Sequence, residues 1–126
     1  MMKRYKVAIT TDGSGNATAF SPRLKGKVHQ IEYVKDPGAN PFAAGVDFAI
    51  TGEATGIGLW TENDVNACAI RAPRVPTHSQ VGAASLYAAG GTAVQDKIGL
   101  ANDRVKFVIS SGGAAKLGAF HVLIDE

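Results

Sequence analysis

The chain has 126 residues, a common single-domain length at which folding buries roughly two-thirds of the surface of the unfolded chain. Its apolar residues are largely Ala, Val and Ile, and 15 residues are Gly, a composition that favours short strands and tight turns. Thirteen Lys and Arg against eleven Asp and Glu give a net charge of +2, which argues against the dense basic surface of a nucleic-acid-binding protein.

Four segments alternate apolar and polar residues with a period of two, which predicts strands with one buried face. Their apolar positions are Tyr5, Val7 and Ile9, then Val46, Phe48 and Ile50, then Val105, Phe107 and Ile109, and finally Phe120, Val122 and Ile124. Weaker signals bounded by turn residues cover 17–21, 27–34, 56–61, 67–71 and 97–101. We therefore expect an all-β fold, an antiparallel sandwich or jelly-roll-like barrel of about 8–9 short strands in one domain spanning 1–126.

The segment after the first predicted strand carries oxygen side chains at alternate positions, Asp12, Ser14 and Asn16. It lacks the central Gly and the later Glu of a calcium-binding loop, so a hairpin turn is the better interpretation. The three histidines, His29, His78 and His121, are far apart and have no second ligand at metal-binding spacing. We expect no metal, no cofactor and no catalytic residues.

The stretch 73–92 is the one long region without a strand signal, and a loop of that length within a domain is usually functional or mobile. Its Ala-rich centre, 83–89, could form one or two helical turns that Gly90 and Gly91 would stop. We interpret the stretch as an arm or long loop that contacts a partner. The residues chosen there as contacts are Pro73, His78, Gln80, Leu86 and Tyr87.

Two further contact candidates lie outside this stretch. Trp60 is out of phase with Ile57 and Leu59, so it either faces outward as a contact residue or is buried where a bulge shifts the register. Tyr5 belongs to the N-terminal segment 1–6, which could add to a sheet edge through main-chain hydrogen bonds.

The remaining sequence signals concern redox state and location. Cys68 is the single cysteine, so it cannot form an internal disulfide and is expected to be a small buried apolar residue. The basic residues near the N-terminus are not followed by an apolar stretch, so no signal peptide is expected, and no run is long enough to span a membrane.

Several segments resemble small virion structural proteins of tailed bacteriophages. They are Val7-Ala8-Ile9-Thr10-Thr11-Asp12-Gly13, Gly26-Lys27-Val28-His29-Gln30-Ile31, Asp47-Phe48-Ala49-Ile50-Thr51-Gly52-Glu53, Ile98-Gly99-Leu100-Ala101-Asn102-Asp103-Arg104 and Gly118-Ala119-Phe120. The resemblance implies a non-enzymatic capsid decoration or cement protein, located in the virion and assembled in the host cytoplasm. It implies as partners the major capsid protein and copies of the chain itself, as a trimer before a dimer, with no nucleic acid and no membrane.

Other functions remain open at this stage. The chain could be another phage head or tail component, or a carbohydrate- or ligand-binding β-sandwich module in which Trp60, Tyr33 or Tyr87 form an exposed aromatic platform. An enzyme would need His78 beside a buried carboxylate.

Overall fold

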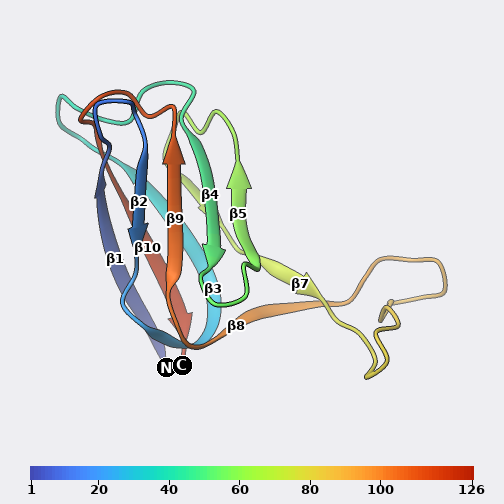
Figure 1. Ribbon diagram of the computed structural model, residues 1–126. Helices are drawn as coiled ribbons and strands as arrows, with labels where there is room; N and C mark the ends of the chain where they lie inside the picture. Colours follow the sequence, from blue (N-terminus) through green and yellow to red (C-terminus); the bar gives the residue numbers. More distant parts are fainter.

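A computed structural model describes residues 1–126 and shows two antiparallel sheets packed face to face, with no helix (Figure 1). The prediction of an all-β antiparallel sandwich is confirmed. Its strands are β1 (Met2–Thr10), β2 (Ala17–Phe20), β3 (Leu24–Lys35), β4 (Asp47–Gly52), β5 (Gly58–Glu62), β6 (Ala69–Arg71), β7 (Arg74–Pro76), β8 (Gln95–Asp103), β9 (Val105–Ser110) and β10 (Leu117–Asp125). The chain contains no helix long and apolar enough to cross a membrane.

The larger sheet has the order β1-β10-β3-β8-β7, and the smaller sheet has the order β2-β9-β4-β5. The 12-residue strand β3 organises the larger sheet. One of its edges pairs with β10, while the other pairs with β8 near its start and with β6 near its end. On that second edge, β8 pairs up to Val28 and β6 pairs from Ile31, which leaves a gap at residues 29–30. β7 and the first part of β8 leave the sheet beside this gap.

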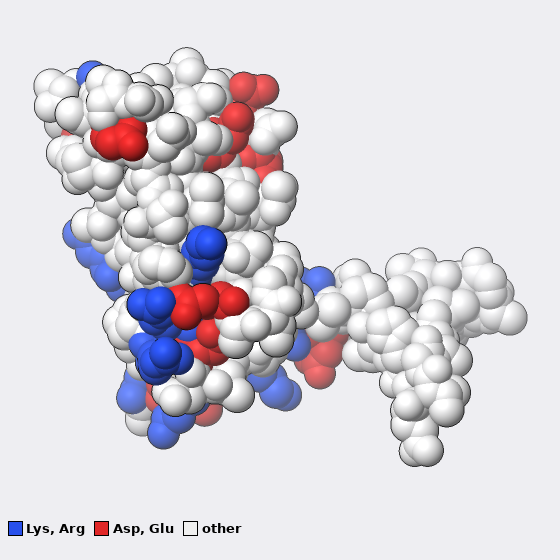
Figure 2. Space-filling view, viewed as in Figure 1, with Lys and Arg blue, Asp and Glu red and all other residues white.

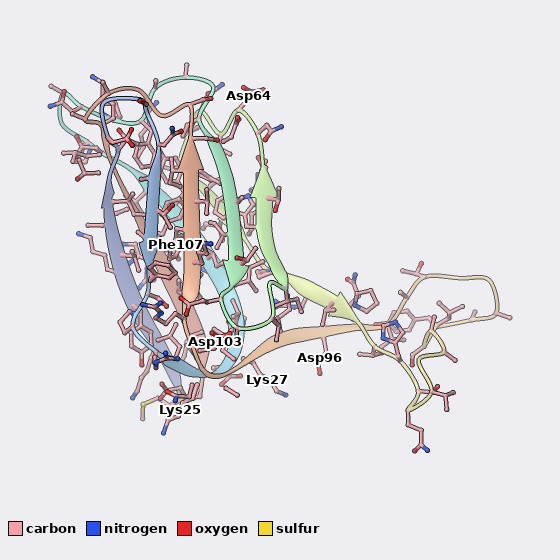
Figure 3. All side chains as sticks on the ribbon, in the orientation of Figure 1. Lys25, Lys27, Asp64, Asp96, Asp103 and Phe107 are labelled. Carbon is pink, nitrogen blue, oxygen red and sulfur yellow. The ribbon has the colours of Figure 1, made fainter.

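The core between the sheets follows the predicted alternation. Phe48 and Phe107 point inward from the smaller sheet and Phe120 from the larger one, and all three are at most 1% exposed; Figure 3 labels Phe107. The Phe48 and Phe120 rings meet edge to face with centroids 4.9 Å apart. Burial of each such side chain contributes about 1.5–3 kcal/mol, so the aromatic cluster is a main source of stability.

A bulge places Trp60 in the core. Ile50 pairs with Trp60 but Thr51 pairs with Gly58, so Leu59 is an extra residue on β5. The extra residue allows both Leu59 and Trp60 to be buried, each 5% exposed. The sequence left two interpretations of Trp60 open, and the one in which it faces outward as a contact residue is therefore wrong.

Other expectations also need correction. The stretch predicted to lack strands contains β7, and the Ala-rich segment 83–89 forms turns and an isolated bridge instead of helical turns. Cys68 is exposed, with its Sγ accepting a hydrogen bond from the Lys35 amide. The N-terminal segment already pairs with β10 of the same chain as β1.

Candidate functional site: the projecting arm

A hairpin leaves the sandwich between β6 and the part of β8 that pairs with β3, residues 98–103. Its stalk pairs Arg74 with Lys97, Val75 with Asp96 and Pro76 with Gln95, and its tip comprises residues 77–94. We call residues 74–97 the arm. In Figure 1 the arm runs away from both sheets, and in Figure 2 it stands clear of the body of the molecule. It contributes nothing to the core cluster except Val75 at its base, which packs against the cluster.

The tip is held together by its own backbone. Three passes of the chain meet where the Thr77 amide donates to the Val94 carbonyl at 2.8 Å, the Ser85 amide donates to the Thr77 carbonyl at 3.0 Å and the Val94 amide donates to the Ser85 carbonyl at 2.9 Å. These bonds divide the tip into two small loops, 78–84 and 86–93. The tip therefore has a defined shape without any support from the sandwich.

Each loop closes with a turn that contains a glycine in the left-handed region. In the first loop the Gly82 amide donates to the Ser79 carbonyl at 2.9 Å, and Gly82 has φ of 82°. In the second loop the Gly91 amide donates to the Ala88 carbonyl at 2.8 Å, and the preceding Gly90 has φ of 68°. Both φ values favour glycine, because other residues rarely adopt them without strain.

The surface of the tip carries no Lys, Arg, Asp or Glu and exposes several large apolar side chains. Between Arg74 and Asp96 the chain has no Lys, Arg, Asp or Glu, so the arm is white beyond its base in Figure 2. Val81 is 85% exposed, Tyr87 75% and Leu86 41%. Single exposed apolar residues are ordinary, but three on one protruding uncharged segment are characteristic of a contact surface.

The base of the arm is anchored at a β-bulge. On β3, Val28 pairs with Ile124 and Gln30 with Leu123, so His29 has no partner on β10. The Arg74 Nη1 donates to the His29 carbonyl at 3.1 Å and to the Pro73 carbonyl at 2.7 Å. The guanidinium thus satisfies the His29 carbonyl in the gap between the β8 pairing, which ends at Val28, and the β6 pairing, which begins at Ile31. It thereby anchors the base of the arm.

An ion pair completes this anchor on the other strand of the stalk. Lys97 Nζ lies 3.1 Å from Asp125 Oδ2, and this ammonium group holds the pKa of Asp125 below its usual value. Figure 3 shows Asp96 on the stalk and Lys27 on the sandwich near the point where the stalk leaves it. Charges therefore gather at the base of the arm, while the tip carries none.

The structure brings four of the predicted contact residues together and separates the others. His78 and Gln80 lie in the first loop of the tip, and Leu86 and Tyr87 lie in the second. Pro73 precedes β7 at the base. Val81, the most exposed large apolar residue of the tip, was missed, although the absence of charges from 75 to 95 is a signal that could have found it.

Tyr5 and Trp60 do not belong to this surface. Tyr5 is on β1, at the end of the larger sheet opposite β7, and its hydroxyl donates to Glu126 at 3.0 Å. Trp60 is buried, with its Nε1 donating to Glu62 at 3.1 Å and the Arg71 guanidinium 5.3 Å from its ring centroid. Tyr33 is 2% exposed, so the predicted aromatic platform of Trp60, Tyr33 and Tyr87 does not exist.

Comparisons with known proteins found one solved structure that is similar to this chain and no matching family. No family model matches, and no curated protein matches. The solved structure described as "Crystal Structure of FLHE" is similar with a TM-score of 0.45 and 11% sequence identity, covering 99% of this chain and 98% of that one. An identity of 11% does not transfer a function from FLHE to this chain.

The comparison corrects the resemblance drawn from the sequence. The structure that matches over nearly the full length is FLHE and not a phage virion protein, so the predicted capsid decoration or cement function is wrong. The predictions that depended on it are wrong with it, namely the major capsid protein and a trimer of the chain as partners and the virion as location. The short turn-and-strand segments behind the resemblance are typical of many antiparallel sheets.

Proposed function

We propose that this chain is a non-enzymatic protein-binding module whose arm inserts its tip into a concave, apolar surface of a partner protein. The observation that carries the proposal is the exposure of Val81, Leu86 and Tyr87 on a protruding segment with no charged residue. Transfer of such side chains from water into a partner contributes about 25 cal/mol per Å² of apolar area, and no charged group has to be desolvated.

The tip is preorganised, which reduces the cost of binding. Its backbone hydrogen bonds are already made within the two loops, and its base is fixed by Arg74 and Lys97. A segment that is ordered before binding loses little conformational freedom on association. The tip has 18 residues, close to the roughly 20–30 residues that one partner contributes to a standard interface.

The composition of the tip favours a protein over a membrane. Surfaces that bind membranes usually combine apolar residues with Lys and Arg, which the tip lacks. It has instead Tyr87 together with hydroxyl, amide and imidazole groups such as Ser79, Gln80 and His78. Tyr, Ser and Gly dominate the protruding loops with which antibodies contact proteins, because Tyr supplies a rigid apolar area and the small polar residues adapt their hydrogen bonds.

Site-specific crosslinking in the producing cell tests the proposal. A photo-crosslinking phenylalanine analogue replaces Tyr87 in one variant and the exposed body residue Ala101 in a control variant. We expect one protein to be crosslinked at position 87 and not at position 101. Equal crosslinking at both positions, or none at 87, contradicts the proposal.

The crosslinked partner is then purified and titrated with the unmodified chain. We expect the double variant Val81→Ser, Tyr87→Ser to raise the Kd at least about 30-fold, the effect of losing about 2 kcal/mol at a binding hot spot. The control Lys106→Gln, on the sandwich, should leave the Kd unchanged. Flotation of the chain with neutral phosphatidylcholine vesicles, lost in the double variant, would instead identify a membrane as the target and overturn the proposal.

A further inference from the structure

A second surface, independent of the arm, lies on the outer face of the larger sheet. It is a groove of about 260 Å³ near the ends of β1, β10 and β3 and the start of the following loop. Its lining includes Lys6, Ala8, Leu117, Ala119 and Asp36. Apolar and charged side chains converge in this groove, and the arm takes no part in it.

The register of the sheet explains why this face is hollow. Ala8, Ala119 and Val34 are direct cross-strand neighbours on β1, β10 and β3. The next row toward the chain termini contains Lys6 and His121, and the next row toward the loops contains Thr10 and Leu117. Since the alanine side chains are shorter than those of both neighbouring rows, a trough runs across the strands with alanines as its floor.

The two ends of the trough carry opposite charges. Lys6 belongs to one wall on β1, and Asp36 follows Lys35 at the far end on the β3 side. None of the ion pairs of the chain includes Lys6 or Asp36. The groove therefore offers a free ammonium group and a free carboxylate on either side of an apolar floor.

The sheet geometry sets the separation of these charges. Lys6 and Asp36 are two strand spacings and four residues apart, which places their Cα atoms roughly 16 Å from each other. Since a Lys side chain reaches about 6 Å and an Asp side chain roughly 2–3 Å from the Cα atom, the charged groups can approach to on the order of 8 Å. A single α-amino acid carries both charges on one carbon and cannot span this gap, whereas an extended peptide of two or three residues, at about 3.5 Å per residue, can.

We infer that this groove binds a short zwitterionic peptide of two or three residues with an apolar side chain, its carboxylate at Lys6 and its ammonium group at Asp36. The apolar side chain lies on Ala8 and Ala119, beside Leu117. His121 contributes to the wall next to Lys6. Its Nδ1 is buried without a hydrogen-bond partner, so Nε2 is the ring nitrogen that the ligand can reach.

Titration with the tripeptide Ala-Leu-Ala, followed by nuclear magnetic resonance, tests the inference. We expect saturable shifts at Ala8 and Ala119 and none at the arm. The variant Ala119→Leu fills the floor and should weaken binding at least about 10-fold, while Ala101→Leu, the same change at an exposed position of β8, should have no effect. Absence of saturable shifts in the groove overturns the inference.

Blocked peptides identify the role of each charge. Lys6→Gln should weaken binding of the free peptide about three- to five-fold, the effect of an exposed ion pair, but should not weaken binding of the C-terminally amidated peptide further. Asp36→Asn should behave in the same way toward the N-acetylated peptide. Equal affinity for free and doubly blocked peptides, or for hexanoate, overturns the zwitterion assignment.

Discussion

At the scale of single residues, the stability of the sandwich depends on a few aromatic side chains that span both sheets. Phe120 is fully buried, and its ring lies 4.9 Å from those of Phe48 and Phe107 and 5.3 Å from that of Tyr33. Burial raises the pKa of the Tyr33 hydroxyl to about 12. Burial therefore keeps the Tyr33 hydroxyl protonated into alkaline solution, where an exposed tyrosine would already ionise.

Removal of the central ring should therefore destabilise the protein strongly. We expect Phe120→Ala to lower the free energy of unfolding by about 3–5 kcal/mol, because it loses apolar burial and leaves a cavity among rings that cannot collapse into it. Phe20→Ala, the same change at a residue 38% exposed, should cost roughly 1 kcal/mol, including its contact with the Arg104 guanidinium. Urea denaturation followed by circular dichroism measures both. Similar losses for the two variants would contradict this account of the core.

The ionisation of Asp12 makes the stability of the turn after β1 depend on pH. Its Oδ1 accepts the Ser14 amide at 2.8 Å and the Asn16 amide at 3.0 Å, and the hydrogen bonds from Asn16 and Ser14 hold the pKa of its carboxyl below the usual 3.8. Because the pKa is lower in the folded state, the carboxylate stabilises the fold above about pH 4. This contribution is lost as the pH falls through the folded pKa.

The variant Asp12→Asn keeps an acceptor oxygen but cannot titrate. We expect its thermal unfolding temperature to fall less between pH 7 and pH 3 than that of the unchanged chain. Other carboxyls with lowered pKa, such as Asp125 and Glu126, titrate in both proteins and cancel in the difference. Equal decreases in the two proteins would show that the turn does not sense pH.

At the scale of elements, the sequence predicts a strand well where one face is buried along its length. The four strongly alternating segments became β1, β4, β9 and β10. β7 could not be predicted in this way, because its three residues are half-buried or exposed and are held by pairing with β8. The bulge that buries Trp60 also breaks the alternation, so the sequence left two interpretations open.

The arm could be predicted as a segment but not as a shape. Its long stretch without strand signals pointed to residues 73–92, close to the observed tip. The two loops of the tip depend on hydrogen bonds among Thr77, Ser85 and Val94, which no periodicity reveals. The Ala-rich run did not become a helix, because seven residues before a Gly pair have no neighbouring surface on which a helix could pack.

Since the tip makes its own hydrogen bonds, the sandwich should not need it. In the test variant, residues 77–94 are replaced by Asn-Gly, a two-residue turn that suits the pairing of Pro76 with Gln95. We expect the β-type circular dichroism spectrum to be unchanged and the urea midpoint to be at least as high as in the unchanged chain. Partner binding should be abolished in the same variant. A lower midpoint or loss of cooperative unfolding would show that the tip is part of the folding unit.

At the scale of the whole molecule, the sandwich separates its two candidate surfaces. The arm departs from the β8 side of β3, whereas the groove lies across β1, β10 and the far half of β3 (Figure 1). The groove could not be predicted from the sequence, since its floor joins Ala8, Val34 and Ala119 from strands whose order no period-two pattern specifies. The two surfaces share no lining residue and no hydrogen bond.

Sites without shared contacts on a rigid body should act independently, because free-energy changes at well-separated positions add. We therefore expect Ala119→Leu to leave the Kd of the crosslinked partner unchanged, and the arm replacement to leave the Kd of Ala-Leu-Ala unchanged. In the chain with both changes, each binding defect should equal that of the single change. Titration calorimetry of the four proteins measures this directly. A peptide affinity that depends on the bound partner would instead show that the stalk, through Arg74 and the bulge at His29, couples the arm to β3.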